Sequence, residues 1–232
     1  MEKKITGVLI VAAGKGVRSK SIVPKQYLQF GDQTVLEKNI ENFICEPLID
    51  FVQVVINENH VEFYKKTVTK IGSSKLLPTC FGGKTRSESV KNGLNAIANI
   101  GCTKILIQDG ARPFTSSLII RKCIKGLDEF DVVFPGIKIP DTLYFKKKKN
   151  KKETISNLGP NRDFLIRAQT PQAFRFEYIY QRHLDSEEQY TDDVNLAFLD
   201  KKKIDIISGS EYNFKITTAE DIKIAEKLFL NV

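Results

Sequence analysis

Residues 7–18 read GVLIVAAGKGVR, a short apolar run that leads directly into a glycine-rich turn. An uninterrupted apolar run of this length predicts a strand buried on both faces, in the middle of a sheet. Glycines after such a strand let the backbone approach a ligand closely and leave N–H groups for anionic oxygens. Lys15, Arg18 and Lys25 would surround those oxygens with positive charge. A tight strand-to-helix turn with solvated cations explains the residues equally well, because a lone G-x-G is a weak motif.

Outward from this stretch, strand-like and helix-like segments alternate along most of the chain. Thr34 with Glu37, and Thr85 with Glu88, have the spacing of capping boxes at helix starts. Strands separated by helices predict an α/β fold with a mostly parallel sheet covered on both faces, whose ligands bind beyond the carboxyl ends of the strands. We expect further strands at 51–56, 75–81, 104–108, 131–137 and 203–207, and helices at 34–43, 61–71, 85–100, 116–127, 176–183, 191–199 and 218–229.

The pattern changes between residues 138 and 160. Segments 139–148 and 151–157 alternate like the two strands of a hairpin around Lys149 and Asn150. We therefore expect one domain over residues 1–232, with an arm at 138–160 that projects from it.

The net charge of +8 suggests a polyanion partner, but the excess is confined to two short runs. Six lysines lie within 146–152 and three more at 201–203, and without these nine the chain has 27 basic and 28 acidic residues. A lysine run of this kind is typical of a solvated hairpin tip, and no aromatic residue within 146–152 offers a base-stacking surface. We expect neither nucleic acid nor membrane as a partner.

Four cysteines lie far apart and there are only two histidines, which argues against a zinc finger, an iron–sulfur site or a disulfide scaffold. No segment reaches the length of a transmembrane helix. The first 13 residues resemble a signal peptide in charge and hydropathy, but the glycine-rich turn that follows has the character of a ligand-binding loop. We expect a cytoplasmic protein with reduced thiols.

Two further loops carry residues suited to phosphate chemistry. Residues 82–89, GGKTRSES, would place free N–H groups at a helix start, but the spacing does not fit a Walker A motif because Pro78 stands where its first glycine belongs. Residues 108–114, QDGARPF, place Asp109 at the end of a strand beside Arg112. Such a carboxylate can hold Mg²⁺ directly or through water, and such an arginine can bind a phosphate. An ordinary helix cap and a turn-capping ion pair are the alternatives.

Taken together in order and spacing, these motifs resemble the 2-C-methyl-D-erythritol 4-phosphate cytidylyltransferase family of the non-mevalonate isoprenoid pathway, over nearly the whole chain. The motifs that carry the resemblance are Ala12-Ala13-Gly14-x-Gly16-x-Arg18, Pro24-Lys25-Gln26-Tyr27, Gly82-Gly83-x-x-Arg86-x-x-Ser89-Val90, Asp109-x-Ala111-Arg112-Pro113-Phe114, Ala168-Gln169-Thr170-Pro171-Gln172-Ala173-Phe174, Thr191-Asp192-Asp193 and Lys215-Ile216-Thr217-Thr218.

The resemblance implies a Rossmann-like, three-layer nucleotidyltransferase fold whose β-arm clasps a second copy in a homodimer. It implies that Arg18, Lys25 and Lys215 are catalytic and neutralise phosphate charge. The implied CTP-binding residues are Ala12, Ala13, Gly14, Gly16, Gly83, Ser89 and Asp109. The implied residues for the sugar-alcohol phosphate are Asp109, Arg112, Thr142, Arg162 and Thr191, with Thr142 and Arg162 acting in the partner's site. Asp109 would also lie near Mg²⁺ or another divalent cation, the implied cofactor, with contact direct or through water.

The chain departs from the family pattern at three positions. Ser19 stands where the family usually has Met, and Gln108 and Gly110 replace a usual His and Ala. These departures bear on the packing of the loops more than on the reaction, because Asp109 and Arg112 are present. We expect no fused cyclodiphosphate synthase domain.

Several other functions stay open. A ribitol 5-phosphate cytidylyltransferase would share the fold and reaction, and a transferase that uses UTP and a sugar 1-phosphate is a more distant relative of the same kind. A nucleotide-binding regulatory module without turnover, or an RNA binder that uses the lysine runs, would belong to different classes.

Overall fold

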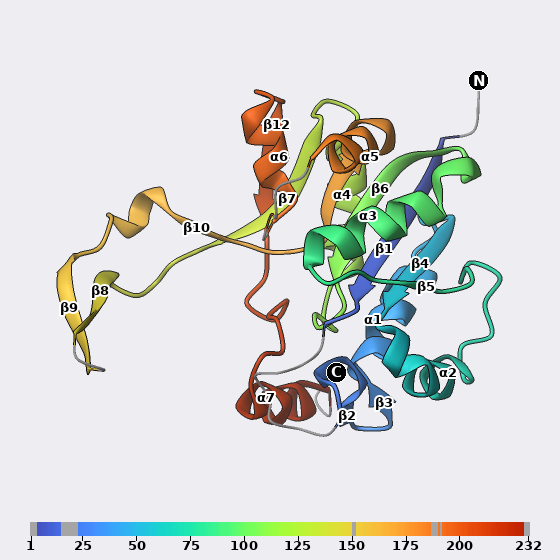
Figure 1. Cartoon of the computed structure of the whole chain (residues 1–232), viewed down its shortest axis with the longest axis horizontal. Helices are drawn as coiled ribbons and strands as arrows, with labels where there is room; N and C mark the ends of the chain where they lie inside the picture. Colours follow the sequence, from blue (N-terminus) through green and yellow to red (C-terminus); the bar gives the residue numbers. More distant parts are fainter. Residues whose placement is uncertain (1–3, 15–22, 150–151, 187–189, 191, 230–232) are drawn as a thin grey trace.

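The structure, a computed structural model, describes residues 4–14, 23–149, 152–186, 190 and 192–229 (Figure 1). Three predicted site residues, Gly16, Arg18 and Thr191, lie outside these described residues. No helix in the described ranges combines the length and apolar character needed to cross a bilayer.

The core of the molecule is an eight-stranded, mostly parallel sheet, as predicted. The predicted strand at 7–12 is part of β1, which lies in the centre and pairs in parallel with β4 on one side and β6 on the other. The order is β10 (Ile166–Ala168), β7 (Val132–Lys138), β11 (Gln172–Arg175), β6 (Cys102–Asp109), β1 (Ile5–Ala12), β4 (Phe51–Ile56) and β5 (Cys80–Phe81), with β12 (Ile204–Ser208) parallel to β7.

Helices cover both faces of the sheet, which gives the expected three layers (Figure 1). Alternate residues of β1 point to opposite faces: Val8 and Ile10 join one hydrophobic cluster, and Leu9 joins the other. One face carries α1 (Val35–Ile44), α2 (Val61–Val68) and α4 (Ser117–Gly126), and the other carries α3 (Arg86–Ala96), α5 (Phe176–Asp185) and α6 (Val194–Leu199). A third, smaller cluster joins α7 (Ala219–Phe229) to the short hairpin of β2 (Gln29–Phe30) and β3 (Gln33–Thr34).

The two predicted capping boxes differ in the structure. At α1 the box is complete, since Thr34 accepts from the Glu37 N–H and the Glu37 carboxylate accepts from the Thr34 N–H. At α3 Thr85 caps the helix by accepting from the Glu88 N–H, but the Glu88 carboxylate accepts instead from the N–H of Lys84. The prediction for α3 was therefore right for the Thr85 cap and wrong for Glu88. The Glu88 carboxylate instead stabilises the loop that precedes the helix.

The segment between the arm and α5 was not predicted to be strand, and it forms β10 and β11. β11 pairs antiparallel with both β6 and β7, so it fills the space between two strands that precede it in the chain. The predicted strand at 75–81 shrinks to β5 with one isolated bridge at Leu76, since Pro78 has no N–H to donate. The predicted helix at 191–199 begins only at Val194.

The predicted arm forms a hairpin that extends away from the body of the molecule (Figure 1). β8 (Tyr144–Lys149) pairs antiparallel with β9 (Lys152–Leu158), and this two-stranded sheet is separate from the main one. Apolar side chains on the arm are exposed, with 67% of Ile155 and 68% of Leu158 accessible. A two-stranded hairpin that exposes this much apolar surface has little stability of its own in water.

Candidate active site

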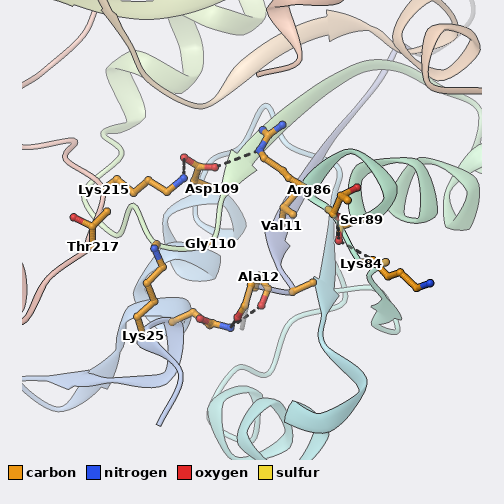
Figure 2. A pocket seen from close by; sticks show the side chains of 16 residues that line it. Val11, Ala12, Lys25, Lys84, Arg86, Ser89, Asp109, Gly110, Lys215 and Thr217 are labelled. Atoms are coloured by element: carbon orange, nitrogen blue, oxygen red, sulfur yellow. Dashed lines mark hydrogen bonds and ion pairs between the residues drawn. The ribbon is translucent and has the colours of Figure 1, made fainter. Parts of the chain in front are cut away.

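The described residues enclose a cavity of about 400 Å³ at the carboxyl ends of β1 and β6, beside the start of α3. Figure 2 shows Lys25 and Lys215 pointing into this hollow, whereas Lys84 extends away from it. The lining residues are Val11, Ala12, Ala13, Gly14, Lys25, Gln26, Gly83, Lys84, Thr85, Arg86, Ser89, Asp109, Gly110, Ala111, Lys215 and Thr217. The predicted residues Ala12, Ala13, Gly14, Lys25, Gly83, Ser89, Asp109 and Lys215 therefore share one cavity.

A buried glutamine holds Lys25 beside the end of β1 and Gly14. Lys25 begins a short 3₁₀ turn, η2 (Lys25–Tyr27), in which Gln26 is only 2% exposed. The Gln26 amide donates to the carbonyl of Ala12 at 2.8 Å and to that of Gly14 at 3.1 Å. One side chain thus fixes the spacing between the end of β1 and the lysine beside it.

Replacing Gln26 by alanine should therefore weaken the nucleotide site while the fold stays intact. The variant removes the Gln26 donor from the carbonyls of Ala12 and Gly14 and frees η2 to move relative to Gly14. We expect the KM for CTP to rise about tenfold, equivalent to roughly 1.4 kcal/mol of lost binding, with a smaller change in kcat. Steady-state kinetics measure this, with circular dichroism as a check on folding. An unchanged KM in a folded variant would show that the clamp plays no part in binding.

Asp109 is the acidic side chain among the described lining residues, and three cations surround it. Its Oδ2 lies 2.9 Å from Lys215 Nζ and 3.2 Å from Arg112 Nε, and its Oδ1 lies 3.8 Å from Arg86 Nε. Burial alone would raise the pKa of Asp109, but the charges of Lys215, Arg86 and Arg112 outweigh burial and hold the pKa well below its usual range. The carboxylate is therefore ionised at neutral pH and cannot act as a proton donor there.

The loop that carries Lys215 is anchored to the sheet on both sides of the lysine. Arg112 Nη1 donates to the Asn213 carbonyl at 2.8 Å, and the Ile216 N–H donates to the Ala111 carbonyl at 2.8 Å. Arg112 is thus tied into the scaffold beneath the cavity, and its predicted contact with the sugar phosphate stays a prediction. The anchoring limits Lys215 to motion of its own side chain.

The loop before α3 satisfies its own N–H groups. The N–H of Gly83 donates to Ser89 Oγ at 3.1 Å, and the Ser89 hydroxyl donates to the Thr85 carbonyl at 2.8 Å. With Lys84 bonded to Glu88, the expectation of free donors at both positions was wrong. The Ser89 side chain thus stabilises the loop through hydrogen bonds to Gly83 and Thr85, and its predicted contact with the nucleotide stays a prediction.

Comparison with known proteins shows the family to which the whole chain is related. The sequence profile described as 2-C-methyl-D-erythritol 4-phosphate cytidylyltransferase matches residues 6–231. The chain belongs to this family.

Relatives of the cytidylyltransferase family match along most of the chain. An enzyme of that name from Clostridium tetani is 35% identical, covering 97% of this chain and 91% of its own length. A bifunctional enzyme IspD/IspF from Wolbachia pipientis is 38% identical over 95% of this chain, which spans 55% of that longer protein. The crystal structure of 4-diphosphocytidyl-2C-methyl-D-erythritolsynthase from Anaerococcus prevotii superposes with a TM-score of 0.81 at 31% identity, covering 98% of this chain and 96% of that one.

Two departures from the usual cytidylyltransferase pattern fit their surroundings. Gln108 is fully buried, and its amide donates to Thr115 Oγ1 at 2.9 Å and to the Arg112 carbonyl at 3.2 Å, so it holds the turn after β6. At Gly110 an added Cβ would lie 2.8 Å from the Cβ of Ala12, which explains why glycine fits where β6 and β1 end side by side.

Thr142 and Arg162 lie on or beside the arm and do not line the cavity. Both are exposed, and Arg162 donates to the Pro140 carbonyl within the same arm. Within one chain, Thr142 and Arg162 therefore lie apart from the residues that line the cavity.

The structure adds three residues whose roles the sequence did not indicate. Arg86 lines the cavity and forms an ion pair with Asp193, which in turn contacts His183. Arg86 and Asp193 belonged to quoted motifs, but no sequence rule connects residues more than 100 positions apart. A buried position for Asp193 could be suspected only from the acidic pair that precedes a helical segment.

Stability should fall as the solution becomes acidic, because two buried carboxylates are stabilised in their charged form. For Asp193, as for Asp109, burial would raise the pKa, but Arg86 and a hydrogen bond from His183 bring it below the ordinary value of 3.8. The unfolded chain then binds protons at a higher pH than the folded one, so the free energy of unfolding decreases as pH falls through about 4. Urea unfolding between about pH 6 and pH 3 measures the slope. The Asp193→Asn variant should show a shallower slope, and an equal slope would contradict this origin.

Proposed function

We propose that this chain transfers CMP from CTP to 2-C-methyl-D-erythritol 4-phosphate, releasing 4-diphosphocytidyl-2-C-methyl-D-erythritol and pyrophosphate. The observation that carries the proposal is the meeting of Lys25, Asp109 and Lys215 in one cavity that Gly14 also lines. Family membership over residues 6–231 supports the choice of substrates.

The reaction joins two anions, so the obstacle is charge repulsion. A phosphate oxygen of the sugar alcohol attacks the α-phosphorus of CTP, a new P–O bond forms, and the bond to the β-phosphate breaks with its electrons on pyrophosphate. The second pKa of a phosphate monoester is about 6, so the nucleophile is already largely dianionic at neutral pH and needs no general base. Lys25 and Lys215 can offset the negative charge from fixed positions, and Arg18, which lies outside the described residues, is proposed to do the same.

The residues of the cavity fit a divalent cation that arrives bound to the triphosphate. No group of three or more His, Cys, Asp or Glu side chains suited to a metal gathers anywhere in the described ranges, and Asp109 is already shared by three cations. Mg²⁺ in nucleotide enzymes is commonly held by phosphates and waters with one or two carboxylates, a role Asp109 could fill through water. When bound, the ion would neutralise phosphate charge.

We also propose that the arm completes a homodimer. The exposed apolar residues of β8 and β9 support this, since a second copy would cover them. The dimer would bring Thr142 and Arg162 into the partner's cavity, where they would bind the methylerythritol phosphate. Four free cysteines support a reducing compartment, and we place the reaction in the cytoplasm.

Pyrophosphate release from CTP tests the function directly. We expect release with 2-C-methyl-D-erythritol 4-phosphate and a much lower kcat/KM with ribitol 5-phosphate under the same conditions. UTP in place of CTP tests the base. Faster release with ribitol 5-phosphate would reassign the substrate, and no release with either alcohol phosphate would remove the proposal.

A further inference from the structure

Arg86 bridges two carboxylates that come from opposite ends of the sequence. Its Nη1 lies 2.7 Å from Oδ2 of Asp193, and its Nε lies 3.8 Å from Oδ1 of Asp109. The side chain leaves the first turn of α3 and is 22% exposed, at the edge of the cavity (Figure 2). One guanidinium therefore connects a cavity carboxylate to one that lies outside the cavity.

Asp193 is a fixed anchor for this arginine. It is fully buried and its second oxygen, Oδ1, lies 3.1 Å from Nε2 of His183 on α5. Ser87, the next residue of α3, adds two further contacts to the same segment: it accepts from the Tyr190 N–H at 2.8 Å and donates to the Tyr190 carbonyl at 3.0 Å. The first turn of α3 is thus held on the outer side of the cavity.

The other oxygen of Asp109 faces Lys215 and Arg112, so Arg86 competes with them for one carboxylate. Arg86 lies beside Oδ1 of Asp109, whereas the ammonium of Lys215 lies beside Oδ2 and is directed at the cavity. Without Arg86, the carboxylate can turn both oxygens toward Lys215 and Arg112. The orientation of the Asp109 carboxylate therefore depends on Arg86, which contacts it from α3 and not from the loop that carries Lys215.

Stability alone is a weak reason for such an arrangement. Replacing a buried ion pair by apolar side chains of similar volume is often neutral for folding, whereas removing one partner leaves an uncompensated charge. The Arg86–Asp193 pair is thus better explained by its effect on the position of Asp109 than by its effect on stability.

From this geometry we propose that Arg86 is a positioning residue for the transfer reaction: anchored by Asp193 and His183, it holds Asp109 so that the ammonium of Lys215 stays available to the phosphates. The inference rests on the proposed function. It assigns no contact between Arg86 and substrate, because the side chain acts through Asp109.

The test compares wild type with the Arg86→Met, Asp193→Leu double variant. The double variant removes both members of the Arg86–Asp193 ion pair, so neither charge is left buried without the other and the net charge is unchanged. We expect urea unfolding near that of wild type and kcat lowered about 10- to 100-fold, as small misplacements of catalytic groups produce. The KM for CTP should change little. A matched control is the Arg121→Met, Glu46→Gln pair, an ion pair outside the cavity, which should leave kcat unchanged.

A second readout does not depend on turnover. Acylation of Lys215 by an amine-reactive reagent, followed by peptide mass spectrometry, should be slower in the double variant because Asp109 then holds the ammonium with both oxygens. Arg86→Lys, which keeps the charge but lacks the rigid, planar fork of the guanidinium, should also have a lowered kcat and remains testable if the double variant fails to fold.

The outcomes separate the two proposals. Absence of pyrophosphate release by wild type removes the proposed function, and the acylation rates still decide the inference. Wild-type kcat in the folded double variant, full kcat in Arg86→Lys, or unchanged acylation of Lys215 would each overturn the role of Arg86.

Discussion

Lys215→Ala is expected to lower kcat by about 100- to 1000-fold while the protein remains folded, the loss typical of removing one preorganised charge from a transition state. The side chain is 38% exposed and its backbone is anchored independently through Asn213 and Ile216, so truncation leaves the loop in place. Product formation in quenched single-turnover experiments measures the chemical step without product release.

Lys223→Ala is the matched control, because that lysine is exposed on α7 and does not line the cavity. It should keep wild-type turnover. Near-normal turnover by the Lys215→Ala variant would show that this lysine plays no part in the mechanism.

Mixing two inactive variants should restore activity if the arm of one subunit completes the site of the other. Lys25→Ala disables the core half of a site and Arg162→Ala the arm half, so we expect each alone to lose most activity. A mixed dimer then contains one site with both residues intact. With random exchange of equal amounts, about a quarter of all sites are complete, and activity should approach about a quarter of wild type.

Mixing Lys25→Ala with Lys215→Ala is the control, because both changes lie in the core half and no mixed dimer has a complete site. Subunit exchange is verified by native mass spectrometry of differently labelled chains. If exchange is complete and the Lys25→Ala, Arg162→Ala mixture stays inactive, the arm does not serve the neighbouring site.

The sequence predicted the parallel part of the fold because its signals are local. The apolar run at 7–12 and the cap formed by Thr34 and Glu37 are each contained within a few residues. β10 and β11 were missed for the opposite reason. They are three and four residues long, Pro171 lies between them, and their status as strands depends on β6 and β7, which lie far earlier in the chain.

The site was predictable where residues follow strands and unpredictable where side chains connect distant segments. Asp109 ends β6 and Lys215 follows β12, and the rule for parallel sheets together with the family resemblance placed both. The ion pair of Arg86 with Asp193, and the clamp that Gln26 forms on Ala12 and Gly14, are tertiary contacts without a local pattern.

The position of β11 has a consequence for biosynthesis. β6 and β7 emerge from the ribosome before the strand that lies between them, since residues 172–175 follow both. Until that segment emerges, the nascent half-sheet presents the edge of β6, with its unpaired N–H and C=O groups, to solvent and to other chains. The hairpin of β8 and β9 is synthesised within this interval. The last central strand therefore closes the sheet late, which makes slow folding and exposure to chaperones a property of this topology.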